Sequence, residues 1–447
     1  MNNSLIQVRE YGVVAEGIRL QKDSADFREV DAATFSNLMS FIEQQSSKQD
    51  FEQAFVIYRK SGRRHIRVKN YVGVIETSSG TTLEILPKLF NDQGGINLTD
   101  SKIIFLRMLK SLYESPYLKV DSAHLETIKN FPILEFFIQN YITELEYIVR
   151  EGLTNNYIDI EENVNFLRGK LLVTENLKNN LITHHKFYCQ YDEFSTNTSL
   201  NKILKTTLRH LILRTKSSAN KRKLLNLMSH FENTDYSINV GADIDKCKKD
   251  FRRLSKFQTI LDWSEVFLTG RSFGNFTGSV SNSSMLFPME KLFENYICHL
   301  IKKYCSGLVI KAQDRRFSLV SQKANIADTN FKVNIFNLRP DIVLNNNVAV
   351  LDTKWKLLNE NIKKFNISEA DIYQMHAYGR RYQQSNDFNI PPRLGLIYPM
   401  NPNFNKDLMQ MRFGTDMLLD VIPINLSASP AIEIKRVVNK FLINFTN

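Results

Sequence analysis

The chain has 447 residues, enough for two or three domains that each bury a core. Hydrophobic residues make up 43% and charged residues 23%, which is typical of a soluble globular protein. No stretch approaches the roughly 18 apolar residues of a membrane span. Four scattered cysteines argue against a zinc ribbon or a disulfide framework, and the N-terminus lacks a signal-peptide pattern, so we expect a cytoplasmic protein.

Residues 1–98 are predicted to form a β-rich N-terminal domain. A helix is expected from about Ala32 to Gln44, and two hairpin patterns follow it. In the first, residues 54–58 and 64–68 flank a Ser61-Gly62 turn. In the second, residues 71–75 and 82–86 flank Ser78-Ser79-Gly80.

The formal net charge is +11, which suits a polyanionic partner without proving one. One basic cluster contains Arg63, Arg64 and Arg67, which are candidate contacts to nucleic acid or to a partner, because phosphate contacts need charge and little geometry. A second cluster comprises Lys246, Lys248, Lys249, Arg252, Arg253 and Lys256. A solvated face is at least as good an interpretation of either cluster alone.

Residues 99–270 are predicted to form a mainly helical middle region, with helices over about 103–113, 132–151 and 200–213. The Gly/Ser-rich stretch from Gly270 to Ser284 predicts a loop or linker into a C-terminal domain, residues 271–447. The sequence has neither a Walker A motif nor a Rossmann glycine fingerprint, so no nucleotide site is expected on this chain.

The C-terminal domain holds the pattern with the clearest chemistry. Two β-prone runs, 339–344 and 348–356, flank three asparagines, which predicts a β-hairpin. Asp341 opens the first strand, and Asp352 and Lys354 lie two apart on the second, so they share a face. Two carboxylates and an amine at one end of a hairpin are what Mg²⁺-dependent phosphodiester hydrolysis needs.

A surface hairpin with solvated charges is the bland alternative to this site. It is disfavoured because Val348 and Val350 share the face of Asp352 and Lys354. A face that begins apolar and ends charged is costly unless the charges meet a metal ion or each other.

Helices are predicted on both sides of the hairpin. Upstream, an amphipathic helix from about Phe287 carries Glu290 and Glu294 on or beside its apolar face. Both could be solvated and paired with nearby lysines, or one could reach a metal ion, and we favour Glu294. Downstream, Gln374 and Tyr378 share a helical face, either for ordinary packing or as part of the site.

The spacing Pro-Asp-x10-Asp-x-Lys, which ends at Lys354, resembles the catalytic core of the PD-(D/E)xK nuclease superfamily. The Gln-x-x-x-Tyr element at Gln374 resembles that of its RecB-like members. The resemblance implies a restriction-endonuclease-like α/β core in which Asp341 and Asp352 bind Mg²⁺ and Glu294 completes the metal site. Lys354 would orient or activate water, or stabilise charge on the phosphate, and Gln374 would help to hold the site or the DNA.

Further stretches resemble the McrC family, in order from about residue 55 to 380. They are residues 70–75 and 83–88, 167–171 with Asn179-Asn180, 191–194 with Asn197 and 201–205, 289–296, and 339–354. The expected fold is therefore α+β and multidomain: a β-rich N-terminal domain, a helical middle region and a C-terminal nuclease core.

This second resemblance implies the Mg²⁺-dependent endonuclease subunit of an McrBC-type, modification-dependent restriction system. Such subunits cut double-stranded DNA together with a separate McrB-like AAA+ motor, which binds the GTP. Their N-terminal region engages the motor and stimulates its GTPase. Two alternatives stay open: a non-enzymatic adaptor or GTPase activator, which the intact Asp341, Asp352 and Lys354 set disfavours, and an autonomous RecB-like nuclease, which the N-terminal half disfavours.

Overall fold

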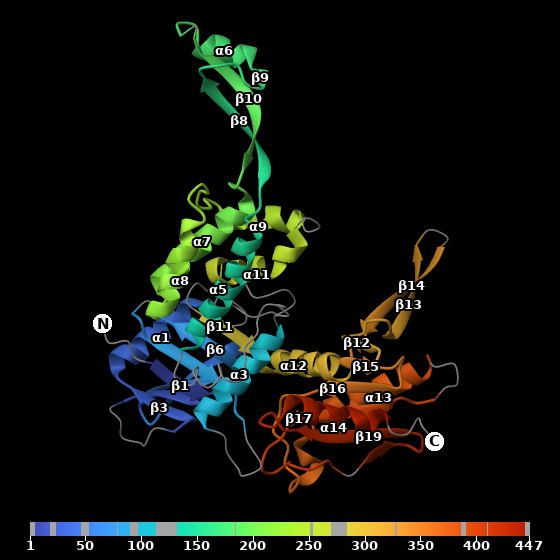
Figure 1. Ribbon diagram of the computed structural model, residues 1–447. Helices are drawn as coiled ribbons and strands as arrows, with labels where there is room; N and C mark the ends of the chain where they lie inside the picture. Colours follow the sequence, from blue (N-terminus) through green and yellow to red (C-terminus); the bar gives the residue numbers. More distant parts are fainter. Residues whose placement is uncertain are drawn as a thin grey trace. The chain divides into compact units, whose positions relative to one another are not determined.

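The computed structural model has a mixed α/β architecture (Figure 1). It describes residues 5–17, 24–45, 53–77, 79–89, 97–112, 132–183, 185–250, 254–269, 284–326, 329–385, 390–408 and 410–442. These residues fall into two compact units. The first unit joins residues up to 112 to residues from 285 onward, and the second unit spans 132–284. None of the helices in these ranges is both long and apolar enough to cross a membrane.

The N-terminal part of the first unit contains two four-stranded sheets. One has the order β1-β7-β6-β11, made of β1 (Leu5–Arg9), β7 (Thr82–Leu86), β6 (Tyr71–Glu76) and β11 (Ser284–Pro288). The other has the order β3-β2-β5-β4, made of β3 (Phe27–Val30), β2 (Val13–Glu16), β5 (Arg63–Val68) and β4 (Phe55–Lys60). The same part of the unit contains helices α1 (Ala32–Gln45) and α3 (Leu98–Leu112).

Both predicted hairpins and the predicted helix of this region are confirmed. Strands β4 and β5 pair antiparallel around Ser61 and Gly62, whose positive φ values of 52° and 77° suit a tight two-residue turn. Strands β6 and β7 also pair antiparallel, although Ser78 of their turn lies outside the described residues. Helix α1 begins after Asp31, whose carboxylate accepts a hydrogen bond from the Thr34 amide at 2.9 Å.

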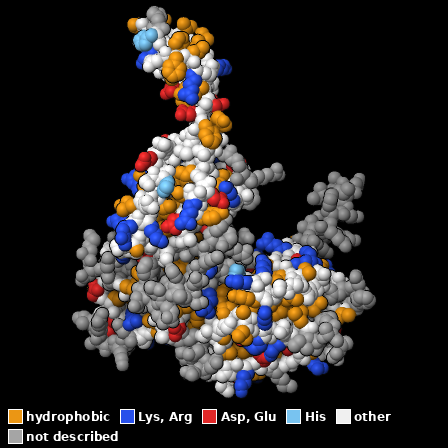
Figure 2. Space-filling model, viewed as in Figure 1, with side chains coloured by type: hydrophobic (Ala, Val, Ile, Leu, Met, Phe, Trp, Pro, Cys, Tyr) orange, Lys and Arg blue, Asp and Glu red, His pale blue; other side chains and the backbone are white. Residues whose placement is uncertain are grey.

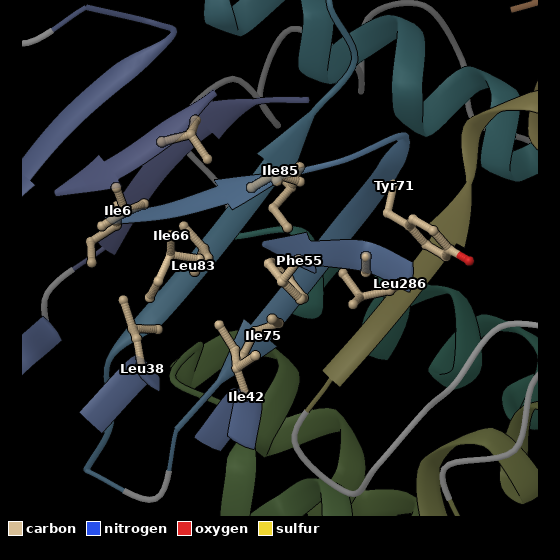
Figure 3. Close-up of a cluster of buried hydrophobic side chains, with 14 of the residues drawn as sticks. Ile6, Leu38, Ile42, Phe55, Ile66, Tyr71, Ile75, Leu83, Ile85 and Leu286 are labelled. Atoms are coloured by element: carbon tan, nitrogen blue, oxygen red, sulfur yellow. The ribbon is translucent and has the colours of Figure 1, made fainter. Parts of the chain in front are cut away.

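The two sheets and α1 share one hydrophobic core. Figure 3 shows its side chains converging, among them Leu38 and Ile42 of α1, Ile66 of β5 and Leu83 of β7. Leu286 of β11 belongs to the same core, although about 200 residues of chain separate it from β7. The N-terminal core is therefore completed by a strand that belongs to the C-terminal half of the sequence.

Gly73 explains how β11 can lie so close to β6. Its φ is +140°, and a Cβ placed there would lie 1.8 Å from the backbone oxygen of Met285. The Met289 amide then donates to the Asn70 carbonyl at 3.2 Å, where β11 passes into α12 (Met289–Tyr304). Only a residue without a side chain fits this crossing, and the crossing fixes where α12 begins.

The C-terminal part of the first unit is a six-stranded sheet with helices on both faces. Its order is β12 (Ile310–Ala312), β15 (Ile342–Leu344), β16 (Ala349–Thr353), β17 (Arg393–Pro399), β19 (Met417–Ile424) and β18 (Met411–Phe413). Strands β16, β17 and β19 run parallel. Leu394 faces Gly379 of α13 (Glu369–Gln383), and the next residue, Gly395, faces Phe441 of α14 (Pro430–Leu442), so the two helices cover opposite faces. A separate pair, β13 (Ser318–Ile326) and β14 (Thr329–Asn337), completes this part.

The predicted hairpin around the three asparagines is confirmed. Strands β15 and β16 pair antiparallel, with Ile342 opposite Leu351. The turn residues Asn345, Asn346 and Asn347 have φ values of 44°, 51° and 78°. Asparagine is the residue other than glycine that best tolerates this left-handed region, which accounts for the run of three.

The second unit is helical with a small sheet attached. Its longer helices are α5 (Ile133–Glu151), α7 (Ser199–Arg214), α8 (Ser218–Ser229), α9 (Val240–Lys249) and α11 (Gln258–Thr269). Several predicted features lie outside the described residues: positions 270–283 of the predicted linker, Tyr113 of the predicted helix 103–113, and Arg252 and Arg253 of the second basic cluster. Ser284, the last residue of the predicted linker, begins strand β11 instead.

The helical expectation for this region missed a three-stranded sheet. Strands β8 (Asn156–Val164), β10 (Phe187–Ser195) and β9 (Lys170–Leu171) form it, with the short helix α6 (Val173–Asn179) alongside. The described side chains of β8 are exposed or half-buried, so the strand lacks the apolar alternation that predicts a half-buried strand. Gly169, with φ +66°, has the Gln190 carbonyl 2.4 Å from where a Cβ would lie, which accounts for the glycine of the 167–171 stretch.

Candidate active site

The β15–β16 hairpin brings the predicted acidic residues together. Asp341 immediately precedes β15, and Asp352 lies near the end of β16, where its side chain is 2% exposed. Asp341 Oδ2 accepts two hydrogen bonds from Thr353, one from the backbone amide and one from the hydroxyl, both at 2.7 Å. The antiparallel register therefore holds the two aspartates beside each other, as the sequence predicts.

Lys354 lies at the centre of this group. Its Nζ is 2.7 Å from Asp352 Oδ2, 3.8 Å from Asp371 Oδ1 and 3.0 Å from Gln374 Oε1, to which it donates a hydrogen bond. The last two residues come from the first turns of α13. Ser368 caps this helix by accepting from the Asp371 amide at 3.1 Å, so the start of α13 is fixed where it meets the lysine.

Gln374 is itself held in place. Its Nε2 donates to the Tyr378 hydroxyl at 2.7 Å, so the amide bridges Lys354 and a tyrosine one turn further along α13. Tyr378 is 3% exposed, and burial together with the nearby Asp352 charge raises its pKa above the ordinary value of 10.0. Tyr378 therefore stays protonated at neutral pH.

Helix α12 supplies the third carboxylate. Glu294 is 6% exposed, and its two oxygens accept from Lys291 Nζ at 2.7 Å and from the Gln313 amide. Glu290, one turn earlier, is exposed. The helix thus turns Glu294, rather than Glu290, toward the aspartates, whose pKa values its charge raises.

The electrostatics show that these groups act on one another. Burial raises the pKa of Asp341 well above its ordinary 3.8, and the negative charges of Asp352 and Glu294 raise it further. Burial also raises the pKa of Asp352, against the opposing effect of Lys354. For Lys354, burial alone would lower the pKa. The negative charge of Asp352, with smaller contributions from Asp371 and Asp341, outweighs burial and raises the pKa.

The donor chemistry of this cluster fits a hard divalent cation. Three carboxylates with little solvent around them form a concentration of negative charge, and oxygen ligands of this kind suit Mg²⁺. In the described ranges, no three Asp, Glu, His or Cys side chains are already grouped as a finished metal site. Instead, the cations of Lys354 and Lys291 occupy the oxygens of Asp352 and Glu294.

Some members of this cluster were not singled out from the sequence. Asp371 is one of them, although it lies three residues before Gln374 and so shares its helical face. Tyr398 of β17 was not identified, and its hydroxyl approaches Asp371 Oδ2 at 3.4 Å. Gln313, which binds Glu294, could not have been found by spacing, because its position depends on a loop with a positive φ of 47°.

The three candidate arginines of the N-terminal region lie on β5, in a different sheet from the carboxylates. Arg64 makes two hydrogen bonds to Glu16, at 2.7 and 2.8 Å, and Arg63 lies 3.4 Å from Glu29. The guanidinium of Arg67 lies 5.2 Å from the centre of the Tyr58 ring. Much of the positive charge of Arg63 and Arg64 is therefore balanced within the chain.

Comparisons with known proteins show which family the chain belongs to and which solved fold it is similar to. The sequence model of the family described as "McrBC 5-methylcytosine restriction system component" matches residues 66–399. A chain from the solved assembly of Thermococcus gammatolerans McrB AAA+ hexamers with bound McrC has a similar fold, with a TM-score of 0.66 and 17% identity, covering 98% of this chain and all of that one.

A chain from the cryo-EM structure of the Thermococcus gammatolerans McrBC complex gives a TM-score of 0.47 and 20% identity, covering 68% of this chain and 88% of that one. No curated protein matches. The family match extends from the middle of β5 to the end of β17 and includes Asp341, Asp352, Lys354, Glu294 and Gln374. The chain therefore belongs to the family of McrBC 5-methylcytosine restriction system components.

Proposed function

We propose that this chain is the Mg²⁺-dependent endonuclease subunit of a GTP-driven, modification-dependent restriction complex. The observation that carries the proposal is the convergence of Asp341, Asp352 and Glu294, from the β15–β16 hairpin and helix α12, with Lys354 beside the two aspartates. The expected PD-(D/E)xK core agrees with this arrangement: a helix with Glu294, a strand that follows Asp341, a strand with Asp352, and a helix with Gln374.

In this proposal Asp341, Asp352 and Glu294 hold Mg²⁺. When bound, the metal ion would act as a Lewis acid and stabilise negative charge on the scissile phosphate. Binding it would require Asp352 and Glu294 to release part of their present contacts with Lys354 and Lys291. Neutralising three neighbouring carboxylates lowers the electrostatic cost that now raises the pKa of both aspartates.

Lys354 is the residue that faces the reacting phosphate in this scheme. Because its pKa lies above the ordinary 10.5, the ammonium is charged at neutral pH. It is therefore suited to orient a water molecule and to stabilise charge on the phosphate. Gln374 holds the ammonium at 3.0 Å and is fixed in turn by Tyr378, which limits the directions that the lysine can take.

The partner in this proposal is an McrB-like AAA+ motor that binds the GTP. The family to which the chain belongs supports this, as does the similar fold of a chain from McrB AAA+ hexamers with bound McrC. The sequence itself has no nucleotide-binding motif, so the GTPase would have to come from another chain. The DNA would be double-stranded. The N-terminal domain predicted from the sequence, residues 1–98, would engage the motor.

The end of the β8–β10 sheet is a second candidate surface for the motor. Figure 2 shows hydrophobic side chains gathered on this end of the second unit. The segment that joins β8 to β10 carries six apolar side chains that are between 59% and 90% exposed: Phe166, Leu167, Val173, Leu177, Leu181 and Ile182. Apolar groups concentrated like this on one short segment indicate a protein contact, and an AAA+ hexamer like the one to which the similar McrC chain is bound is the partner that we propose.

The test is plasmid cleavage in Mg²⁺, with methylated and unmethylated DNA, by wild type, Asp341→Ala and Lys354→Ala, each alone and with the motor and GTP. We expect cleavage by wild type only, and only with motor and GTP. Loss of Lys354 should slow cleavage by about 10²-fold or more. Both variants should still stimulate GTP hydrolysis, because the substituted side chains are local to the site.

Glu294→Ala and Glu290→Ala form a matched pair on one helix. The first should lose cleavage, and the second, whose side chain is exposed, should retain it. Cleavage by wild type without the motor would favour an autonomous nuclease. Absence of cleavage by wild type in every condition, with GTP hydrolysis still stimulated, would refute the nuclease and leave an adaptor.

A further inference from the structure

Trp355 lies where the elements of the proposed site meet. It follows Lys354 directly, two residues after the end of β16, and is 6% exposed. Its indole packs edge-on against the ring of Phe293, with 5.2 Å between the ring centres, and Phe293 is the residue before Glu294. One side chain therefore contacts the helix that carries Glu294 and belongs to the segment that carries Asp352 and Lys354.

The polar end of Trp355 reaches the N-terminal sheet. Its Nε1 donates a hydrogen bond of 2.8 Å to Glu10 Oε1, across 345 residues of sequence. Glu10, just after β1, is 1% exposed and receives a second hydrogen bond from the Lys88 amide at 2.8 Å. Its own amide donates to the Leu86 carbonyl at 2.8 Å, at the end of β7. Glu10 is thus fixed by β1 and β7, and it holds the indole.

Burying the carboxyl group of Glu10 at this position costs folding free energy. Its second oxygen, Glu10 Oε2, is buried and has no hydrogen-bond partner in the described part of the chain. An apolar side chain of similar size would avoid the cost of burying that oxygen. What an apolar side chain cannot do is accept the indole N–H. The cost is therefore best explained by a need to hold Trp355 in one orientation.

We propose that Glu10 and Trp355 are positioning residues for the proposed metal site, and that their hydrogen bond fixes the end of β16 against α12. The bond ties the sheet of β1 and β7 to the two elements that carry Lys354 and Glu294. Among the described residues, neither side chain is hydrogen-bonded to Asp341, Asp352 or Glu294, so the bond acts indirectly on the site. The inference rests on the proposed nuclease function, and the following test separates the two.

Two substitutions remove the bond from opposite ends. Trp355→Phe keeps the ring against Phe293 but deletes the N–H donor, and Glu10→Ala deletes the acceptor. Glu10→Gln is the rescue variant, because its amide oxygen can still accept from both Trp355 and Lys88. Trp263→Phe, the same substitution at the only other tryptophan of the chain, is the matched control, since Trp263 lies in α11 of the second unit.

Two readouts are needed, both with the full chain. The first is Mn²⁺ binding, measured by loss of the electron paramagnetic resonance signal of the free ion. The second is plasmid cleavage with motor and GTP as a function of Mg²⁺. Trp355→Phe and Glu10→Ala should each weaken Mn²⁺ binding or cleavage about 10- to 100-fold, the usual effect of losing a group that orients metal ligands. Glu10→Gln and Trp263→Phe should stay near wild type in both readouts, and GTPase stimulation should be unchanged in all four.

The outcomes separate the two proposals. If wild type neither binds Mn²⁺ nor cleaves DNA, the nuclease proposal fails and the positioning role fails with it. If wild type does both, and Trp355→Phe and Glu10→Ala match it, only the positioning role is overturned. The positioning role is also overturned if the two variants lose GTPase stimulation as fully as cleavage, because the effect would then be general misfolding. It is overturned as well if Glu10→Gln is as impaired as Glu10→Ala, because the effect would then not depend on the hydrogen-bond acceptor.

Discussion

Glu10 makes a quantitative prediction about how stability depends on pH. Burial raises the pKa of its carboxyl from an ordinary 4.5 to about 8, although the Lys88 amide, the Trp355 indole and the charge of Lys88 all pull the other way. Near neutral pH the folded protein therefore holds Glu10 protonated, whereas the unfolded chain has released that proton. Folding must take up a proton at this residue, so alkaline conditions work against it.

The magnitude follows from the two pKa values. Below pH 4.5 both states are protonated and Glu10 causes no loss. Between pH 4.5 and about 8 the unfolded state alone releases the proton, so the free energy of unfolding falls by about 1.4 kcal/mol for each pH unit. Above pH 8 both states are ionised and the loss levels off at about 5 kcal/mol. Replacing Glu10 by Gln removes this titration and preserves the acceptor, so the variant should gain stability over wild type as pH rises.

Urea unfolding from pH 5 to pH 9 measures the effect. In a Trp263→Phe background, Trp355 is the only tryptophan, and its fluorescence reports on the first unit. Asp341 and Asp352 also have raised pKa values, but they are common to both proteins, so the difference between wild type and Glu10→Gln isolates Glu10. A difference that stays constant across this pH range would refute the reasoning, because it would mean that Glu10 ionises alike in both states.

Two further predictions concern single positions elsewhere in the fold. Gly73→Ala should destabilise the first unit by about 3 kcal/mol in urea unfolding, since its Cβ would overlap the Met285 oxygen. Gly241→Ala, in α9, is the control, because a Cβ placed there would have only the Asn239 side chain within 4 Å, and it should change the free energy of unfolding by less than about 1 kcal/mol. Equal effects at the two positions would contradict the close approach of β6 and β11. Ile182→Asp changes a side chain that is 90% exposed, so it should shift the free energy of unfolding by about 0.5 kcal/mol at most. It should nevertheless weaken binding to the motor, measured by pull-down and by stimulation of the GTPase. Unchanged binding would remove this surface from the proposal.

The parts that could be predicted from sequence depend on short-range patterns. The hairpin of β15 and β16 follows from two apolar runs around three asparagines, and its register then determines that Asp341 lies beside Asp352. That Glu290 and Glu294 both lie on or beside the apolar face of one helix follows from helical periodicity, whereas only the structure separates the buried Glu294 from the exposed Glu290. In each case the deciding interactions join residues within about a dozen positions, or lie on one helix.

The parts that could not be predicted depend on distant partners. Nothing local marks Glu10 as the acceptor for Trp355, because the two are 345 residues apart. Gly73 looks like an ordinary strand glycine until β11 is seen to lie against it. Strand β8 was missed for another reason: its side chains are mostly exposed, so the hydrophobic alternation that indicates a strand is weak.

The placement of β11 has a consequence for how the chain is made. Strand β6 ends at Glu76, and the strand that covers its edge begins at Ser284. At a translation rate of about 5 to 20 residues per second, roughly 10 to 40 seconds pass between the synthesis of the two. For that time the nascent N-terminal sheet has an open edge and a core without Leu286. A ribosome that stalls within the second unit would release a chain with that edge exposed, and such fragments should be recognised by chaperones or aggregate, rather than persist as a free N-terminal domain.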